Sequence, residues 1–198
     1  MTNVTRQTLI ARIKNQHDDK SWSEFVQLYE RYIFAVVHKM GVNYDECNDL
    51  VQKVLLQLWK KLPDFEYVPG KCKFRSWMNV IIRNTVIDYI RKSQRHQNDI
   101  KRATLQHIND KVDDFSTPDV YDIAQEEWET HISNLAWENI KGDFQGKTAD
   151  CFLLLCEGKS VQDICDELDI KSNTVHVYRN RVQQKLHKEI RRLDNELS

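Results

Sequence analysis

The segment from Lys71 to Arg95 constrains the fold of this chain more than any other. Its sequence, KCKFRSWMNVIIRNTVIDYIRKSQR, contains no Gly or Pro and repeats apolar residues at helical spacing. At about 100° per residue, one broad arc of such a helix is apolar and should face a core. That arc comprises Phe74, Trp77, Met78, Ile81, Ile82, Val86, Tyr89 and Ile90. The segment therefore predicts a long helix with one buried face.

The opposite sector of this predicted helix mixes apolar and basic side chains. Val80 and Ile87 alternate there with Arg83 and Arg91. A purely solvated face has no need of such apolar residues, whereas a nucleic acid offers both phosphates and unstacked bases. The sector is therefore interpreted as a nucleic-acid contact, with an ordinary bundle helix carrying a basic rim as the alternative.

Composition extends the helical prediction to the whole chain. The 198 residues include five glycines and three prolines, and long segments repeat at 3.6 residues rather than two, which predicts an all-α fold of one domain or two small ones.

The net charge of -1 argues against a nucleic-acid partner, but the charge is unevenly distributed. Nine Lys or Arg oppose two acidic residues from Lys71 to Arg102, and seven oppose one from Lys171 to Arg192. Between them, Thr104 to Asn134 holds eight acidic residues and one lysine. Two basic modules with an acidic spacer predict two contacts on one polyanion.

The five cysteines form no C-x-x-C pair, and the N-terminus does not resemble a signal peptide. No apolar run approaches the length of a membrane span, so we expect free thiols in a reducing cytoplasm. Cys151, Cys156 and Cys165 are predicted to be small core residues. No cofactor, metal site or enzymatic activity is expected, because no His, Cys or carboxylate group has metal-ligand or catalytic spacing.

A helix is predicted within Met1–Asp19, and two more are predicted between it and the central segment. The first of these two is capped by Ser21 or Ser23, and the second runs from Tyr44 to Leu62 and stops at Pro63. Leu56 lies among charged residues on the outer arc of the second helix. It is either an ordinary exposed leucine or the anchor of a protein contact.

A loop should join the second of these helices to the central one, because Pro69 and Gly70 break helical structure. Tyr67 lies in the middle of this loop. The loop forms either a pocket for an unstacked base or a tight connector that buries Phe65.

The C-terminal module begins near Leu135 and predicts two helices joined by a tight turn. Ser160 caps the first with Asp163 at the capping-box position, residues 169–171 form the turn, and the second helix starts at Ser172. Its inward residues are Val175, Tyr178, Val182, Leu186 and Ile190. The opposite arc is rich in amide and basic groups that can bind base edges. This is the helix-turn-helix layout, with a generic helical hairpin as the alternative.

The order of these parts resembles the extracytoplasmic-function sigma factors, the small two-domain members of the sigma-70 class. Three runs carry the resemblance: DLVQKVLLQLWKKLPDF, KFRSWMNVIIRNTVIDYIRK and EGKSVQDICDELDIKSNTVHVYRNRVQQKL. It implies a region 2-like domain at 1–95, an acidic linker at 96–134 and a region 4-like domain at 135–198. The implied function is to bind core RNA polymerase, recognise the -35 and -10 promoter elements and assist DNA opening.

The resemblance also implies three sets of contact residues. Those expected on the clamp helices of the polymerase are Asp49, Gln52, Lys53, Leu56, Trp59 and Lys60. Those expected on the -10 element, partly as a single nontemplate strand, are Tyr67, Lys73, Arg75, Ser76, Trp77, Val80, Arg83, Asn84, Ile87 and Arg91. Those expected on the -35 element are Asn173, Thr174, His176, Val177, Asn180, Arg181 and Gln184, in a domain that also contacts the polymerase flap.

Four positions depart from the patterns of related sigma factors. Lys53 stands where an acidic residue is usual, so polymerase docking here should depend less on that charge. Val80 and Ile81 replace the paired aromatics of primary sigma factors, which fits the small subclass that requires well-matched promoters. Asp169 occupies a turn position often held by glycine, which is tolerable because Asp enters the left-handed region.

Two other functional classes compete with this interpretation. A stand-alone helix-turn-helix regulator explains the C-terminal module but not the Asp49–Arg95 block. A structural adaptor that binds only protein predicts no salt-dependent affinity for DNA. The resemblance leaves open whether an anti-sigma factor binds this chain.

Overall fold

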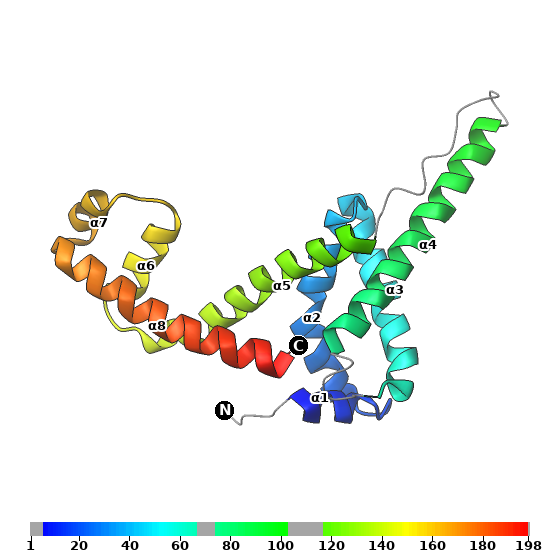
Figure 1. Ribbon diagram of the computed structural model, residues 1–198, viewed down its shortest axis with the longest axis horizontal. Helices are drawn as coiled ribbons and strands as arrows, with labels where there is room; N and C mark the ends of the chain where they lie inside the picture. Colours follow the sequence, from blue (N-terminus) through cyan, green and yellow to red (C-terminus); the bar gives the residue numbers. More distant parts are fainter. Residues whose placement is uncertain (1–5, 67–73, 103–116, 198) are drawn as a thin grey trace. The chain divides into compact units, whose positions relative to one another are not determined.

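The computed structural model describes residues 6–66, 74–102 and 117–197, and within these ranges every regular element is a helix (Figure 1). The all-α prediction is therefore confirmed. The α-helices are α1 (Arg6–Ile13), α2 (Asp19–Lys39), α3 (Tyr44–Lys61), α4 (Phe74–Arg102), α5 (Thr117–Ile140), α6 (Thr148–Cys156), α7 (Val161–Leu168) and α8 (Ser172–Leu197). Two short 3-10 helices are η1 (Leu62–Asp64) and η2 (Lys141–Asp143).

The chain forms two compact units. Unit 1 comprises residues 1–129 and 196–198, and unit 2 comprises residues 130–195. Helix α5 crosses the boundary, so its first half belongs to unit 1 and its second half to unit 2.

Unit 1 is built around the packing of α2, α3 and α4. Phe25 and Tyr29 of α2 meet Phe74 of α4, with ring centroids 5.9 and 5.8 Å apart. Phe65 joins this cluster at 5.5 Å from Phe74 and is 4% exposed. Phe65 is therefore buried, whereas residues 67–73 of the loop before α4, Tyr67 among them, lie outside the described residues, so both interpretations of this loop stay predictions.

The start of α2 differs from the prediction, because neither Ser21 nor Ser23 caps the helix. Asp18 does so, since its carboxylate accepts hydrogen bonds from the backbone N–H and the hydroxyl of Ser21, at 3.0 and 2.6 Å. These bonds stabilise the ionised carboxylate and lower the pKa of Asp18. Ser21 itself is buried, and its hydroxyl donates a hydrogen bond to the capping Asp18 instead of capping the helix.

Much of the predicted acidic linker is helical and part of it belongs to the unit 1 core. Helix α4 continues to Arg102, and α5 begins at Thr117. Trp128 of α5 is 1% exposed, with its ring centroid 5.3 Å from that of Tyr32. Lys39 of α2 also forms ion pairs with Glu126 and Glu127, at 3.2 and 2.7 Å. The sequence allowed a helix from Val120 to Leu135, but it did not reveal the burial of Trp128, because the apolar positions of α5 are interspersed with acidic ones.

Unit 2 has two small core clusters. One is formed by Ile140, Phe144 and Val182, and the other by Cys151, Ile164 and Val175. Cys151 is thus a core residue as predicted, whereas Cys165 is half-buried. The prediction is wrong for Cys156, which is the last residue of α6, is exposed and belongs to neither cluster.

The turn between α7 and α8 has the predicted construction. Ser160 and Asp163 form a reciprocal capping box, in which the Asp163 N–H donates to the Ser160 hydroxyl at 3.2 Å. Asp169 ends α7 in the left-handed region, with φ 48° and ψ 62°. Three residues then separate Leu168 from Ser172. Such a turn sets α8 at an angle to α7 and leaves one side of the first turns of α8 exposed, while Val175 on the other side is buried.

Candidate functional site

The first candidate surface is the outer face of α8, defined by the seven residues that the sequence assigned to the -35 element. Six of them are exposed and Thr174 is half-buried. On the opposite side of the helix, Val175 and Val182 are buried and Tyr178 packs against the α6/α7 cluster. The structure therefore brings the amide, guanidinium and imidazole groups of this set to one side, with Val177 among them at 61% exposed. Such a face can donate to and accept from base edges in a major groove.

The second candidate surface is the outer face of α4, defined as Ser76, Val80, Asn84, Ile87 and Arg91. Ser76, Val80, Asn84 and Arg91 are exposed, and Ile87 is half-buried. The predicted inward arc is confirmed in part. Five of its residues are at most 5% exposed: Phe74, Met78, Ile81, Ile82 and Val86. The other three, Trp77, Tyr89 and Ile90, are half-buried.

The other residues expected at the -10 element have different surroundings. Trp77 is half-buried, and its ring centroid lies 4.7 Å from that of Phe65. Trp77 therefore packs against the segment before α4 and is also partly exposed. The Arg75 guanidinium lies over the Trp128 ring at 5.0 Å, a cation–π contact that the sequence did not predict. Arg83 is half-buried and its guanidinium donates to the Asn84 side chain at 3.5 Å. Lys73 and Tyr67 are outside the described residues.

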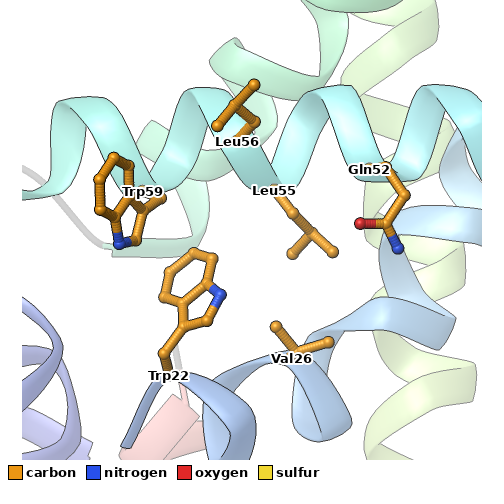
Figure 2. A pocket seen from close by; sticks show the side chains of 6 residues that line it. All are labelled: Trp22, Val26, Gln52, Leu55, Leu56 and Trp59. Carbon is orange, nitrogen blue, oxygen red and sulfur yellow. The ribbon is translucent and has the colours of Figure 1, made fainter. Parts of the chain in front are cut away.

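The third candidate surface is an apolar hollow of about 340 Å³ between α2 and α3, called the α2/α3 groove. It is lined by Trp22, Val26, Gln52, Leu55, Leu56 and Trp59. In Figure 2, Trp22 and Val26 rise from α2 toward α3, while Leu55 points back toward them and Leu56 projects from the other side of the α3 ribbon. Leu56, which the sequence shows as a leucine among charged residues, is 49% exposed and forms one rim of this apolar depression.

Three of the six residues expected at the polymerase line this groove, and three do not. Gln52, Leu56 and Trp59 belong to it. Asp49 and Lys60 are exposed on α3 beyond it. Lys53 faces α4 instead, with its ammonium group 5.7 Å from the centre of the Tyr89 ring.

Two tyrosines of unit 1 have strongly perturbed hydroxyls. The Tyr32 hydroxyl donates to the Asn79 side-chain oxygen at 2.7 Å and lies 3.3 Å from the Ala124 carbonyl. Burial raises the pKa of Tyr32, so the phenol remains a neutral donor that joins α2, α4 and α5. The pKa of Tyr89 is raised to about 12, mainly by a hydrogen bond to the Glu46 carboxylate and secondly by burial. Both groups are therefore structural hydrogen-bond donors at neutral pH.

Sequence reasoning missed half of the α2/α3 groove. Trp22 and Val26 sit four residues apart on α2, which places them on one side of the helix. That spacing was a usable signal, but the sequence interpretation gave Trp22 and Val26 no role. Only the packing of α2 against α3 shows that Trp22 and Val26 are half-buried and face a hollow.

The part of the chain that the structure describes contains no group of three or more His, Cys, Asp or Glu residues placed to hold a metal ion. Within the same residues, no helix combines the length and apolarity needed to cross a bilayer.

Comparison with known proteins links both units to transcription. A family model described as Sigma-70 region 2 matches residues 25–96, and one described as bacterial regulatory proteins of the luxR family matches residues 147–191. A probable RNA polymerase sigma factor from Haemophilus influenzae is 28% identical over 152 residues, which cover 70% of this chain and 75% of the relative. A solved structure of CnrH in complex with the cytosolic domain of CnrY is 14% identical with a TM-score of 0.38, over 93% of this chain and 96% of that one.

Proposed function

We propose that some candidate surfaces of this chain bind RNA polymerase and that the others bind promoter DNA. The chain belongs to the sigma-70 family, as an extracytoplasmic-function sigma factor that directs promoter recognition. Proteins of this family bind RNA polymerase and promoter DNA and act as regulators rather than enzymes. The α2/α3 groove docks on the clamp helices of the polymerase. The outer face of α4 contacts the -10 element, and the outer face of α8 reads the -35 element.

The sorting of side chains around α8 is the observation that supports this proposal most. Its buried side anchors the helix to both core clusters of unit 2, while its other side exposes Asn173, Asn180, Arg181 and Gln184. Asn, Gln and Arg are the side chains that make paired hydrogen bonds to purine edges. A helix with only a structural role would not require these amide and guanidinium groups on its exposed side.

For unit 1, the apolar character of the α2/α3 groove supports a protein partner. An exposed leucine beside two half-buried tryptophans is the composition of an interaction anchor rather than of a solvated helix pair. On α4, Val80 is 42% exposed and can contact bases, while Arg91 can contact phosphates. Val80 and Ile81 lack aromatic rings, so unstacking of the -10 bases must rely on a well-matched promoter sequence.

Run-off transcription with purified core polymerase on a promoter library tests this proposal. We expect initiation that depends on both the added chain and the sequences of the two promoter elements. A stand-alone regulator, which the luxR-type match at residues 147–191 would also fit, predicts specific duplex binding without polymerase and no such initiation. A structural adaptor predicts neither initiation nor salt-dependent DNA binding.

A further inference from the structure

The first half of α5 packs against unit 1 through one side of the helix. We call residues 120–129 the α5 strap, and their sequence is VYDIAQEEWE. Val120, Ala124 and Trp128 follow one another at intervals of four, and each is at most 2% exposed. The Trp128 ring centroid lies 5.3 Å from that of Tyr32 and 6.5 Å from that of Tyr29, both on α2. The strap therefore covers part of α2 with its apolar side.

Polar contacts add to this packing. The Lys39 ammonium group of α2 pairs with the carboxylates of Glu126 and Glu127, at 3.2 and 2.7 Å. The Tyr32 hydroxyl lies 3.3 Å from the Ala124 carbonyl oxygen. The side chains of Lys39 and Glu126 are 46% and 71% exposed, so water and salt screen this pair. The polar contacts can therefore open without leaving a buried charge behind.

The strap also covers a residue that the sequence assigned to the -10 element. The Arg75 guanidinium, in the first turn of α4, lies 5.0 Å from the centre of the Trp128 ring. Arg75 is half-buried. A guanidinium stacked on a ring in this way has less of its surface available to a phosphate or a base. In this structure the strap therefore competes with DNA for Arg75.

The charge of the strap opposes the approach of DNA. Its ten residues include four acidic ones and no basic one. The acidic residues are Asp122, Glu126, Glu127 and Glu129. Lys39 offsets only part of this charge, because its one ammonium group faces two carboxylates. Arg75 and Glu127 both act electrostatically on the Tyr32 hydroxyl, so a strap carboxylate shares the surroundings of Arg75. A phosphate that approaches Arg75 therefore meets a segment of its own sign.

We propose that the α5 strap is an autoinhibitory segment, which must leave unit 1 before Arg75 and the first turn of α4 bind promoter DNA. Opening frees both Arg75 and Lys39, but it also exposes the Trp128 ring to water. The open state is therefore the minor one until a ligand that binds only this state shifts the equilibrium toward it. This inference rests on the proposed function and adds a conformational control to it.

Hydrogen–deuterium exchange of the full chain tests whether the strap leaves unit 1. The amides of residues 120–129 are followed in the free chain and in its complex with core polymerase and a forked promoter, whose -10 region is single-stranded. We expect their protection to fall by about tenfold or more in the complex, because a short helix is marginal without packing. Residues 29–37 of α2 are the internal reference and should stay protected.

Lys39→Gln separates release of the strap from a simple effect of charge. The substitution removes a cation, which by itself weakens DNA binding, but it also breaks both ion pairs to the strap. We expect the apparent Kd of the complex for the forked promoter to fall by about threefold or more, because affinity scales with the fraction of binding-competent molecules. Lys20→Gln is the matched control, since it removes the same charge from an exposed position of α2 outside these pairs. Its Kd should stay the same or rise.

A second variant breaks the same ion pairs from the strap side. Glu126→Gln/Glu127→Gln should also lower the Kd for the forked promoter. Asp122→Asn/Glu129→Gln is its matched control, because it removes two charges from the strap and keeps the Lys39 pairs, so it should lower the Kd less. Thermal unfolding shows that each variant folds, which is expected because only Glu127 among the substituted residues is not exposed.

Unchanged protection of residues 120–129 in the complex overturns the inference. So does a Lys39→Gln variant that binds the promoter no more tightly than Lys20→Gln. Equal effects of the two double variants also overturn it, because the charge of the strap alone would then explain the gain. Failure of the proposed function is distinguishable, since the wild-type complex would then start no promoter-dependent transcript in the run-off assay.

Discussion

The two units present their candidate contact residues in different ways. In unit 2, the residues assigned to DNA follow one side of a single helix, α8, and project from it independently. In unit 1, the α2/α3 groove is made by a pair of helices, with Trp22 and Val26 opposite α3. Contacts made through a hollow of unit 1 therefore depend on tertiary packing, whereas those on α8, like those on the outer face of α4, depend mainly on helical periodicity.

This difference has an energetic consequence. Residues that share a hollow change one another's surroundings, so their substitutions should be coupled, whereas well-separated residues along one helix should act additively. Four predictions test this contrast.

The largest effect is expected in the α2/α3 groove of unit 1. Leu56→Asp places a carboxylate on the apolar rim, and association with core polymerase should weaken by about 2–4 kcal/mol, as for an interface anchor. Because Leu56 is 49% exposed, the unfolding transition should stay close to that of the wild type.

A quantitative pull-down measures this association. Tyr121→Asp is the matched control, because it introduces the same charge at a 46% exposed apolar residue of unit 1 outside the α2/α3 groove. Normal polymerase binding by Leu56→Asp would exclude the groove as the docking site.

In unit 2, Asn180→Ala or Arg181→Ala should reduce discrimination between matched and mismatched -35 elements by about 1–3 kcal/mol. Polymerase binding should be retained. Transcription from paired promoter templates provides the measurement. Arg179→Ala is the control, since losing an exposed charge at the edge of the face would weaken all templates alike. Unchanged promoter preference in both test variants would remove α8 from the -35 contact.

The contrast in coupling is expected to be smaller, about 1 kcal/mol. Trp22→Ala and Leu56→Ala should be non-additive in polymerase binding, because both side chains line the same groove. Asn173→Ala and Gln184→Ala should add within about 0.5 kcal/mol in promoter binding, since they are eleven positions apart along α8, or about 16 Å. Additivity in both pairs would abolish the proposed difference between the units.

The smallest effect concerns the turn of unit 2. Asp169 has φ 48°, a conformation that costs less for glycine, so Asp169→Gly should raise the unfolding free energy by about 0.5–1 kcal/mol. Gly41 follows the C-cap residue of α2 with φ 88°, and Gly41→Ala should lower the unfolding free energy by a similar amount. Calorimetric melting of both variants measures these changes. A destabilising Asp169→Gly would show that the aspartate side chain supports the turn.

The same contrast explains how far the sequence predicted the structure. Helical periodicity was sufficient for the inward arcs of α4 and α8, and local hydrogen-bonding rules were sufficient for the Ser160–Asp163 capping box and the Asp169 turn. These features depend on residues within a few positions of one another. The exposed Leu56 was also visible as an anomaly in the pattern.

The features that the sequence did not predict depend on residues far apart in the chain. The contact between Arg75 and Trp128 and the Tyr32–Asn79 hydrogen bond both join different helices. Acidic composition concealed the apolar stripe of α5, which comprises Val120, Ala124 and Trp128 in unit 1.

Site-specific photocrosslinking tests the central claim, that unit 1 docks on polymerase through α3 while unit 2 reads DNA through α8. A photoreactive phenylalanine analogue replaces either Leu56 or Val177, two exposed apolar side chains at 49% and 61% exposure. Each variant is assembled with core polymerase and a promoter selected from the library. The account predicts that the probe at Leu56 attaches to the polymerase largest subunit and the probe at Val177 to -35 DNA. Attachment of the Leu56 probe to DNA, or of the Val177 probe only to protein, would contradict it.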